Sequence, residues 1–544
     1  MSAEILLRSG RIRTLAGASA SLEGEAGAGR VDEAMLVRGD RIVATGTDAE
    51  MRALAAADAQ VVDLAGRTVL PGFIDAHTHV ELTAMSRHFW IDVRGESRAD
   101  ILGRIRAHAA ATEPGTWAIY QATFGADLPT LDELDAAAPR HPVAVRWSMH
   151  KFIVNRAALD VSGVDESTVP APGMRLQRDD AGRLNGVIEE GWDLLAAPVP
   201  AEEELRPALA ETLASLFLSH GVTTVHEIVA SRAGAGALCD IAETQGPRIG
   251  LNYTVAPGHQ ALVDRVPDAS LLGIATRRPR ARAWVQGLKI FMDGGRDGAF
   301  RSNDGGRDVL AHDPAERWGL LTRLYPTLVD ELATAARLGI RVMTHAIGDL
   351  SQEIAVSAVE QVRARHPELD LRMRIEHFFN ESTGTRRLER LVAAGGIAVP
   401  NPGFVFAEPD DPARRQPQGA TKYALATLRR IQGVIPGNSD TAGAQPFTTN
   451  PWFTMQCMVL LRNRSGLEIT PGEQVDLAAA LRAFTVDAAW ATGQEDEKGS
   501  LEPGKLADFS VIDADPFGVD LDRLDTIGTV ATVIGGAVAF GELP

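Results

Sequence analysis

Two histidines stand one residue apart at the end of an apolar run, in the sequence PGFIDAHTHVEL, residues 71–82. On a β-strand, residues i and i+2 point to the same side, so His77 and His79 can present their imidazoles to one object. Imidazole suits zinc and other divalent first-row metals, which makes a metal ion the natural candidate. Alone, such a pair is structural about as often as metal-binding, but its place after PGFIDA on a predicted strand favours the metal.

Four more residues that can bind a metal or carry a proton end predicted strands further along the chain. They are Lys289 in GLKIFMDG, His345 in VMTHAIGD, His377 in RIEHF and Asp440 in IPGNSD. Each type has a common structural alternative: a core histidine, a lysine that reaches solvent or an ion pair, and a turn or helix-capping aspartate. The positions are informative as a set, and we predict one metal centre in which Asp440 is both ligand and proton carrier.

Lys289 needs its own explanation, because an ammonium group beside two dications would be strongly repelled. A neutral lysine that adds carbon dioxide becomes a carbamate, an oxygen ligand able to bridge two metals. The position of Lys289 in an apolar strand weakens the alternative of an ordinary ion-paired lysine. We therefore predict a carbamate on Lys289 and a centre for one or two divalent ions, with zinc expected.

A second group of residues can face the substrate, although a structural role is at least as common for each. The group comprises His150, Trp192, His226, Glu227, Asp293, Arg296 and Asn401. His226, Glu227 and Asn401 follow predicted strands, whereas His150 and Trp192 lie in a long connection after the first strand.

The elements that must position these residues alternate between strands and helices. The strand candidates are TVLPGFIDAHTH, GVTTVHEIV, RIGLNYTV, VQGLKIFMDG, RVMTHAIGD, RMRIEHF, GIAVPNPG and VIPGNSD. Helical patterns such as TLVDELATAARLG lie between several of them. Eight such strands predict an α/β fold, a (β/α)8 TIM-like barrel over residues 69–488, with reactive groups at the C-terminal strand ends.

About 130 residues separate the first predicted strand from GVTTVHEIV, far beyond an ordinary βα loop of about two to six. We interpret residues from about 84 to 210 as an inserted subdomain. Because it leaves from the C-terminal end of a barrel strand, it begins beside the active-site mouth and is expected to set substrate specificity.

Both ends of the chain have a texture that the middle lacks. Residues 1–68 and 489–544 carry short β-type runs separated by Gly and Asp turn signals. We predict that the two ends pair into one small β-sandwich domain, into which the barrel is inserted.

The composition limits the partners and the compartment. Among 544 residues, 72 are acidic and 54 basic, for a net charge of -18, which argues against nucleic acid and anionic membrane as partners. Cys239 and Cys457 stand far apart and outside any CxxC spacing, which fits a reducing cytoplasm. We expect neither a signal peptide nor a membrane anchor, because no apolar run has the required length or flanks.

The motifs together resemble the amidohydrolase superfamily, and within it amidohydrolase family 3, a group that includes N-substituted formamide deformylases. The matching stretches are LPGFIDAHTHVEL, HPVAVRWSMHKFIVNRAAL, GVTTVHE, LKIFMDG, VMTHAIGD, RIEH, GNSD, FTVDAAWATG and KGSLEPGKLADFSVIDADP. They run along nearly the whole chain, and their order is specific to the family.

The resemblance implies a division of labour within the centre. His77 and His79 would hold one metal, His345 and His377 a second, and carboxylated Lys289 would bridge them. A homodimer is a further family-level expectation. The chain departs from the family pattern in DGGRDGAF, where DGS-type sequences are frequent, and in Asn401-Pro402, where Gln-Pro is frequent. Both departures lie near the expected substrate and concern specificity more than metal binding.

The leading functional hypothesis is hydrolysis of a non-peptide C–N bond in a small molecule, an amide or N-acyl amine, by metal-activated water. The same centre could cleave a cyclic amide, carbamate or ester, and the sequence does not separate these substrates. A catalytically silent binding scaffold ranks lower, because all six strand-end positions are intact.

Overall fold

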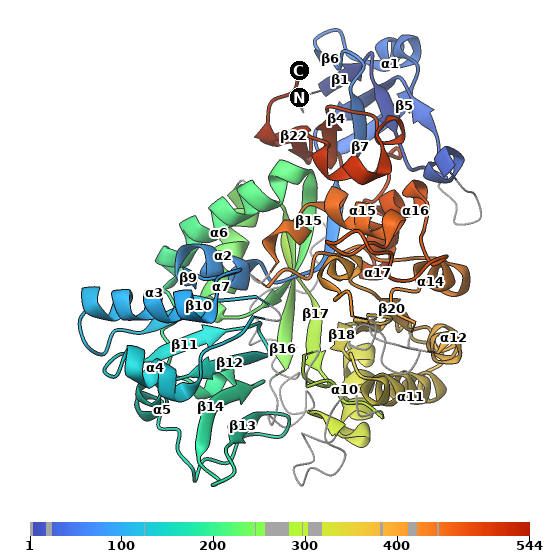
Figure 1. Cartoon of the computed structure of the whole chain (residues 1–544). Helices are drawn as coiled ribbons and strands as arrows, with labels where there is room; N and C mark the ends of the chain where they lie inside the picture. The colour runs from blue at the N-terminus through green and yellow to red at the C-terminus, as the bar shows by residue number, and fades with distance from the viewer. Residues whose placement is uncertain are drawn as a thin grey trace.

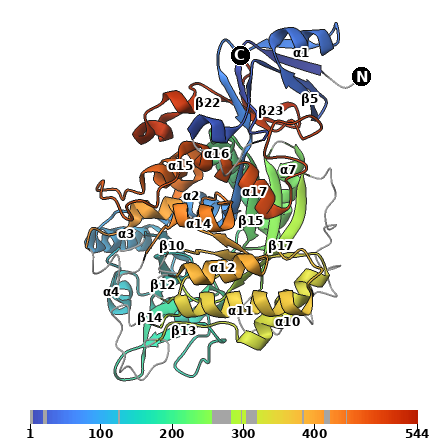
Figure 2. The same cartoon turned by 90° about the vertical axis from the view of Figure 1, so that its right-hand side faces the viewer.

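Three groups of β-strands make up the molecule. The computed structural model describes residues 4–17, 24–123, 126–244, 246–255, 282–295, 298–302, 318–380, 384–411, 421–442 and 445–544. Figure 1 shows strands from both chain ends together at the top, the parallel strands β15 to β20 in the middle and the elements β9 to β14 at the lower left. In the perpendicular view of Figure 2, the strands of the chain ends again lie apart from the rest.

A sheet of seven parallel strands forms the centre, in the order β20-β19-β18-β17-β16-β15-β8. The strands are β8 (Phe73–Thr78), β15 (Val222–Val229), β16 (Arg248–Val255), β17 (Ala283–Phe291), β18 (Arg341–His345), β19 (Arg374–Glu376) and β20 (Ile397–Val399). A sheet buried on both faces reads as continuous apolar runs, which explains the strand signals in the sequence. The curled sheet fits the predicted TIM-like barrel.

Helices follow the strands and pack their apolar side chains against the sheet. For example, α10 buries Leu328, Leu332 and Ala335 at the spacing of an amphipathic helix and contains most of the predicted pattern TLVDELATAARLG. The helices of this part are α2 (Val80–His88), α6 (Glu202–Leu216), α7 (Arg232–Thr244), α10 (Tyr325–Arg337), α11 (Asp349–Arg365), α12 (Thr385–Ala393), α14 (Leu425–Gln432), α15 (Pro451–Leu460), α16 (Leu477–Ala483) and α17 (Val486–Thr492).

The eighth predicted strand, VIPGNSD, is not a regular strand in the described chain. Its backbone nevertheless lies along β8, because Ala76 N–H donates to Gly437 O at 3.1 Å and Asp440 N–H donates to His77 O at 2.9 Å. Pro436 has no N–H to donate, and Asp440 has a left-handed φ of 43°, so the segment cannot continue an extended ladder. This closing segment, residues 435–441, completes the circle where a strand was expected.

The first predicted strand is divided in two at Gly72. Its first half, β7 (Thr68–Pro71), pairs with β2 and β21 of the chain ends, and its second half is β8 of the barrel. A Cβ on Gly72 would lie 2.2 Å from Thr223 Oγ1, so only glycine permits this close crossing. The chain thus passes directly from the terminal sheets into the strand that carries His77.

Strands from the two ends of the chain share one sheet. Its order is β23-β22-β21-β7-β2-β3, and a second sheet has the order β5-β4-β1-β6. The strands are β1 (Glu4–Arg8), β2 (Arg11–Arg13), β3 (Val31–Asp32), β4 (Ala34–Arg38), β5 (Arg41–Gly46), β6 (Gln60–Asp63), β21 (Phe509–Ile512), β22 (Thr529–Ile534) and β23 (Ala537–Gly541), with α1 (Asp48–Leu54) beside them. One apolar cluster joins side chains from both sheets, including Leu7, Val37 and Phe509.

The long connection after β8 forms a sheet of its own, in the order β13-β14-β12-β11-β10-β9. The strands are β9 (Ile91–Asp92), β10 (Ala118–Gln121), β11 (Val143–Arg146), β12 (Lys151–Val154), β13 (Arg175–Arg178) and β14 (Leu184–Glu189), with helices α3 (Arg98–Ala111), α4 (Leu131–Ala137) and α5 (Arg156–Val161). The limits expected from the sequence, about 84 and 210, fall inside α2 and α6, whose buried side chains belong to the barrel core.

Within the described ranges, none of the helices combines the length and the apolar character that a membrane crossing requires.

We expect Gly437→Ala to lower the free energy of unfolding by about 1–3 kcal/mol, the usual cost of overpacking. A Cβ at this position would lie 2.7–2.8 Å from three atoms of the Phe484 ring, and the closing segment can retreat only by giving up its bonds to β8. Chemical denaturation followed by circular dichroism measures the change.

Gly103→Ala is the matched control. This glycine lies within α3 and has no neighbouring atom within 4 Å of the added Cβ. Alanine there should leave stability unchanged or raise it by up to about 1 kcal/mol. Equal losses in the two variants would contradict the proposed role of the Phe484 contact.

Candidate metal centre

The six residues predicted to form a metal centre come together at the C-terminal ends of the barrel strands. His77, Lys289 and His345 lie within β8, β17 and β18, and His79 and His377 directly follow β8 and β19. Asp440 is brought in by the closing segment. The other five residues are buried. The side chain of Asp440 is 8% exposed and that of His377 is 6% exposed.

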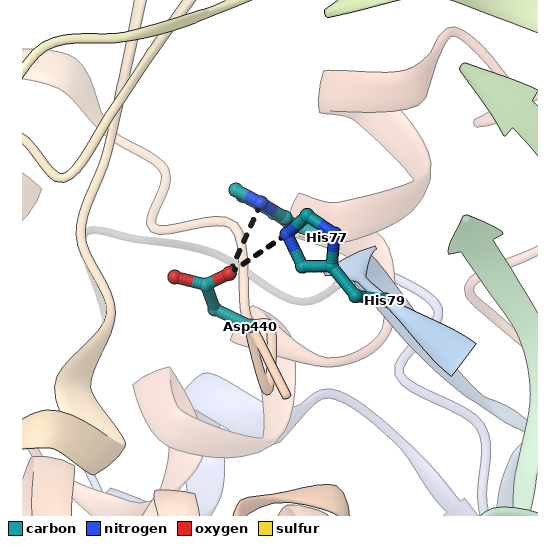
Figure 3. Close-up of side chains that lie close together, drawn as sticks. All are labelled: His77, His79 and Asp440. Atoms are coloured by element: carbon teal, nitrogen blue, oxygen red, sulfur yellow. Dashed lines mark ion pairs between the residues drawn. The ribbon is translucent and has the colours of Figure 1, made fainter. Parts of the chain in front are cut away.

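Asp440 points one carboxylate oxygen at both histidines of the HxH pair, as Figure 3 shows. Its Oδ1 lies 3.2 Å from His77 Nε2 and 3.4 Å from His79 Nε2. The three ligand atoms lie within 4.8 Å of one another, which makes these residues a possible metal-binding group in the described chain. Two imidazole nitrogens and a carboxylate oxygen are donors that zinc accepts.

Lys289, His345 and His377 lie close to these three residues. Lys289 Nζ is 3.2 Å from His77 Nε2, and His377 Nδ1 is 3.6 Å from Asp440 Oδ2. The rings of His345 and His377 have centroids 4.4 Å apart. His345 Nδ1 is buried and has no hydrogen-bond partner among the described residues, so this nitrogen is available as a metal ligand.

Two residues of the centre are held in an unusual backbone conformation. His377 has φ of 68° and Asp440 has φ of 43°, both in the left-handed region that non-glycine residues rarely adopt. Such a conformation costs about 1–3 kcal/mol at each position and concentrates at functional sites. The left-handed turn at the end of each segment directs these side chains into the centre.

Burial keeps the imidazoles neutral. It lowers the pKa of His79 to about 4 and that of His377 to about 3. Burial raises the pKa of Asp440, but the surrounding histidines lower it by a larger amount, so the net pKa lies below the usual range of an aspartate. Neutral imidazoles beside an ionised carboxylate have the protonation states that metal binding requires.

Glu376 and Arg374 hold His77 in place and were not identified from the sequence. Glu376 Oε2 accepts a hydrogen bond from His77 Nδ1 at 2.7 Å, so His77 directs Nε2 into the centre. Arg374 donates to both oxygens of Glu376 and to Ala76 O. The available signal was the spacing in RIEH, which places Arg374 and Glu376 on one face of a strand beside His377.

Asn401, predicted to face substrate, bonds to Asp440. Its Nδ2 donates to Asn438 Oδ1 at 2.7 Å and to Asp440 Oδ2 at 3.3 Å. Asn380 bonds to Asn401 through its amide group on the other side. These buried amides fix the orientation of the Asp440 carboxylate.

Asp75, a further residue missed by the sequence reasoning, joins the closing segment to β8. It accepts hydrogen bonds from the backbone N–H groups of Ser439 and His77. Burial raises its pKa to about 7. The DAHTH sequence therefore contributes an anchoring carboxylate two residues before the first histidine.

His150 lies beside the centre and comes from the added sheet. Its ring centroid lies 4.9 Å from that of His345, and its Nδ1 bonds to Glu190 at 2.9 Å. Burial lowers the pKa of His150, but Glu190 raises it more, so the net shift is upward. Glu190 also accepts from Gly295 N–H, which ties the loop after β17 to the added sheet.

Several other predicted substrate contacts have structural roles. Glu227 accepts from the N–H groups of Val80 and Glu81 at the start of α2, which satisfies the helix terminus directly after His79. The carboxylate of Asp293 accepts from Ile347 N–H, Gly348 N–H and Ser351 Oγ, and so orders the start of α11.

The remaining predicted contacts lie elsewhere. The ring of His226 packs on Trp284, at the beginning of β17 and remote from Lys289 near its end. Trp192 follows β14 and contacts Phe152 and Trp90. Arg296 lies outside the described residues.

Comparison with known proteins agrees with the fold and the motifs. N-substituted formamide deformylase of Arthrobacter pascens is 28% identical over 540 residues, covering 93% of this chain and 95% of that protein. Imidazolonepropionase of Symbiobacterium thermophilum is 24% identical over 493 residues, covering 88% and 83%. An uncharacterized metal-dependent hydrolase from Pyrococcus horikoshii has the same fold, with a TM-score of 0.72 at 20% identity over 95% of this chain and 99% of that one. Residues 60–540 match the amidohydrolase family, to which the chain therefore belongs.

Proposed function

We propose that this protein is a metal-dependent hydrolase that cleaves a non-peptide C–N bond, an amide or N-acyl amine, in a small molecule. The observation that carries the proposal is the convergence of His77, His79 and Asp440, whose ligand atoms lie within 4.8 Å of one another at the strand ends of an amidohydrolase fold. A divalent ion held there would polarise a carbonyl and lower the pKa of a water molecule.

The six strand-end residues divide into two sets of ligands. We assign His77 and His79 to one ion and His345 and His377 to a second, with Lys289 between them and Asp440 as a ligand. The contacts of Asp440 Oδ1 with His77 and His79, and of Oδ2 with His377, support a place for Asp440 beside both sets. Zinc is the ion that we propose, because nitrogen and carboxylate donors predominate.

Asp440 is the proposed proton carrier. Its Oδ2 lies 3.3 Å from Asn401 Nδ2 and 3.6 Å from His377 Nδ1. These contacts keep Oδ2 ionised and oriented, so it can take a proton from the attacking water and pass it to the departing amine. A fixed carboxylate avoids the entropy of reorientation between the two transfers.

Lys289 is the proposed site of carbamate formation. The residue is fully buried, and burial lowers the pKa of its amine to about 8. A substantial fraction of the amine is then neutral and nucleophilic near pH 8, which addition to carbon dioxide requires. An unmodified ammonium 3.2 Å from His77 Nε2 would compete with any ion held there.

The substrate class rests on similarity and on the added sheet. The formamide deformylase relative supports an open N-acyl amine, and the imidazolonepropionase relative supports a cyclic amide as the second candidate. His150 is the proposed substrate contact, because it reaches the centre from outside the barrel. A panel of open and cyclic amides of similar size would decide between the two.

The division of the chain belongs to the same proposal. We propose a terminal β-sandwich from residues 1–68 and 489–544 around a catalytic barrel, 69–488. Pairing of β7 with β21 supports the joining of the two chain ends, and it extends the N-terminal part of this domain to Pro71. Residence in the cytoplasm and a homodimer remain predictions.

The protein as isolated should contain about one to two equivalents of zinc or a similar divalent ion, because the centre offers two sets of ligands. Prolonged chelation should abolish hydrolysis of N-acyl amines, and added divalent metal should restore it. Elemental analysis and a calibrated substrate panel measure both. Full activity in rigorously metal-free protein would contradict the proposal.

Glu376→Gln should weaken metal affinity about 10–100-fold, because the amide has no charge and only one acceptor oxygen, for which His77 and Arg374 then compete. It should also lower the free energy of unfolding by about 3–5 kcal/mol, because Arg374 loses its buried counter-ion. Chelator competition and chemical denaturation measure the two effects.

Glu360→Gln is the control for removal of a carboxylate. Glu360 pairs with Arg390 at a site where its side chain is 37% exposed. Loss of such a pair should cost less than about 1 kcal/mol and leave metal affinity unchanged. If both variants retain wild-type metal affinity, Glu376 has no part in positioning His77.

Lys289→Ala should lose metal and activity together, because the shared oxygen ligand disappears while the histidines remain. Formate or acetate can occupy the vacated space and should partly restore both when metal is added. Lys289→Arg should not be rescued, because its guanidinium stays charged and fills the space. A crystal structure that shows unmodified lysine beside an occupied, active centre would rule out the carbamate.

A further inference from the structure

Arg146 is a buried guanidinium with no partner of opposite charge. It ends β11, its side chain is 2% exposed, and no ion pair or side-chain hydrogen bond joins it to any residue that the structure describes. Its Nε is buried without an acceptor. Buried charges in proteins are normally paired, so this one requires an explanation.

Two tryptophans flank the guanidinium. Arg146 Cζ lies 4.2 Å from the ring centroid of Trp90 and 4.3 Å from that of Trp192. The two ring centroids lie 6.2 Å apart and the ring planes are tilted by 52°, so the cation contacts both rings. Aromatic faces offset part of the desolvation cost of a cation, but they leave the in-plane N–H groups unused.

A second unused polar atom lies in the neighbouring strand. Gln121 ends β10 and is the direct partner of Arg146 in the parallel register of β10 and β11. Side chains at paired positions lie on the same face of a sheet. Gln121 Nε2 donates to Ala122 O, but its Oε1 is buried and has no donor in the described part of the chain. A donor and an acceptor therefore remain unused side by side.

This cluster of Trp90, Gln121, Arg146 and Trp192 is tied to the metal centre by short stretches of chain. Trp90 follows α2, which begins directly after His79. Arg146 precedes by four residues His150, whose ring contacts His345. Trp192 follows by two residues Glu190, which holds His150.

We propose that the cluster is a carboxylate-binding subsite. Arg146 would donate two parallel N–H groups to a carboxylate, the geometry that a guanidinium fork suits best, and the two tryptophan rings would contact the guanidinium from adjacent directions. Gln121 Oε1 would accept from an N–H or O–H group close to that carboxylate. The ligand is a small organic acid, either the acidic end of the substrate, which rests on the proposed function, or a separate acid bound beside the centre.

Burial alone lowers the pKa of Arg146, to about 9, and no carboxylate among the described residues opposes the shift. A bound carboxylate would supply the missing counter-charge. Lysine would not replace arginine well, because its point charge lacks the fork and stacks poorly between aromatic rings.

Titration calorimetry on the metal-loaded protein tests the subsite with a matched pair of probes, N-acetylglycine and its neutral amide. The wild type should bind the acid at least about tenfold more tightly than the amide, which corresponds to one charge-assisted bidentate pair. Arg146→Met should abolish this preference and Arg146→Lys should weaken it. Arg156→Gln, which removes a half-exposed guanidinium from the same sheet region, should retain it.

Two results would overturn the subsite. Equal binding of the acid to wild type and Arg146→Met would mean that the acid only coordinates the metal. No preference for the acid in the wild type would mean that Arg146 holds water alone. Unfolding curves of both Arg146 variants are recorded first, and Arg146→Lys carries the test if Arg146→Met does not fold.

Inhibition kinetics distinguish the two sources of the acid. Competitive inhibition of the hydrolysis of an N-substituted formamide by N-acetylglycine, lost in Arg146→Met, would place the subsite in the substrate path. Binding without inhibition would assign it to a separate acid. Calorimetry does not depend on turnover, so failure to find any hydrolysed substrate would count against the proposed function and leave the subsite to its own test.

Discussion

The hydrogen bond between Glu376 and His77 organises the interior of the barrel. Glu376 is fully buried, and burial raises its pKa, but the charge of Arg374 and the hydrogen bond from His77 lower it more, to about 2. The carboxylate is therefore ionised whenever the protein is folded under ordinary conditions. Because Glu376 occupies His77 Nδ1, only Nε2 can meet Asp440 and Lys289. Arg374 also bonds to Ala76 O, which joins β19 directly to β8 although β20 and the closing segment lie between them around the barrel.

The charges around this bond also bear on the lysine. Inside the strand ends, Lys289 and Arg374 are positive and Glu376 and Asp440 are negative, so these four side chains balance when the lysine is an ammonium. Addition of carbon dioxide turns that positive charge into a negative one, a change that equals the charge of one divalent cation in size and opposes it in sign. Modification of the lysine and uptake of an ion would thus each make the other less costly, since isolated charge is expensive in a buried site. Two weakly bound components would behave as one tightly bound pair.

The sequence identified the residues with a direct chemical signal and missed those that support them. HxH spacing, apolar strands and polar strand ends were enough to predict the barrel. They were also enough to predict that six strand-end residues would lie together: His77, His79, Lys289, His345, His377 and Asp440. Glu227, Asp293 and Asn401 were predicted to face the substrate, and the structure adds hydrogen bonds to the backbone or to Asn438 that the sequence did not indicate, because a polar residue after a strand looks the same whether it faces a substrate or caps the next helix. Arg374 bonds to Ala76 O and Asp75 bonds to Ser439 N–H, and these partners are distant in sequence, so only the folded chain reveals the bonds. The closing segment was predicted as a strand from its apolar start, whereas Pro436 and the left-handed Asp440 make it irregular.

Pairing of β7 with β21 has a consequence for how the molecule is made. Phe509 lies opposite Pro71, so a strand from the beginning of the chain must wait for one from near its end. During synthesis, β7 is therefore an exposed edge throughout the time in which the barrel residues emerge from the ribosome, and such edges invite pairing with other chains. β8 leaves β7 after a single glycine, so the strand that carries His77 is tethered to this unfinished sheet. Closing such a long loop costs entropy that only later contacts repay, and we expect slow maturation in which metal-binding competence appears after the last strands have docked.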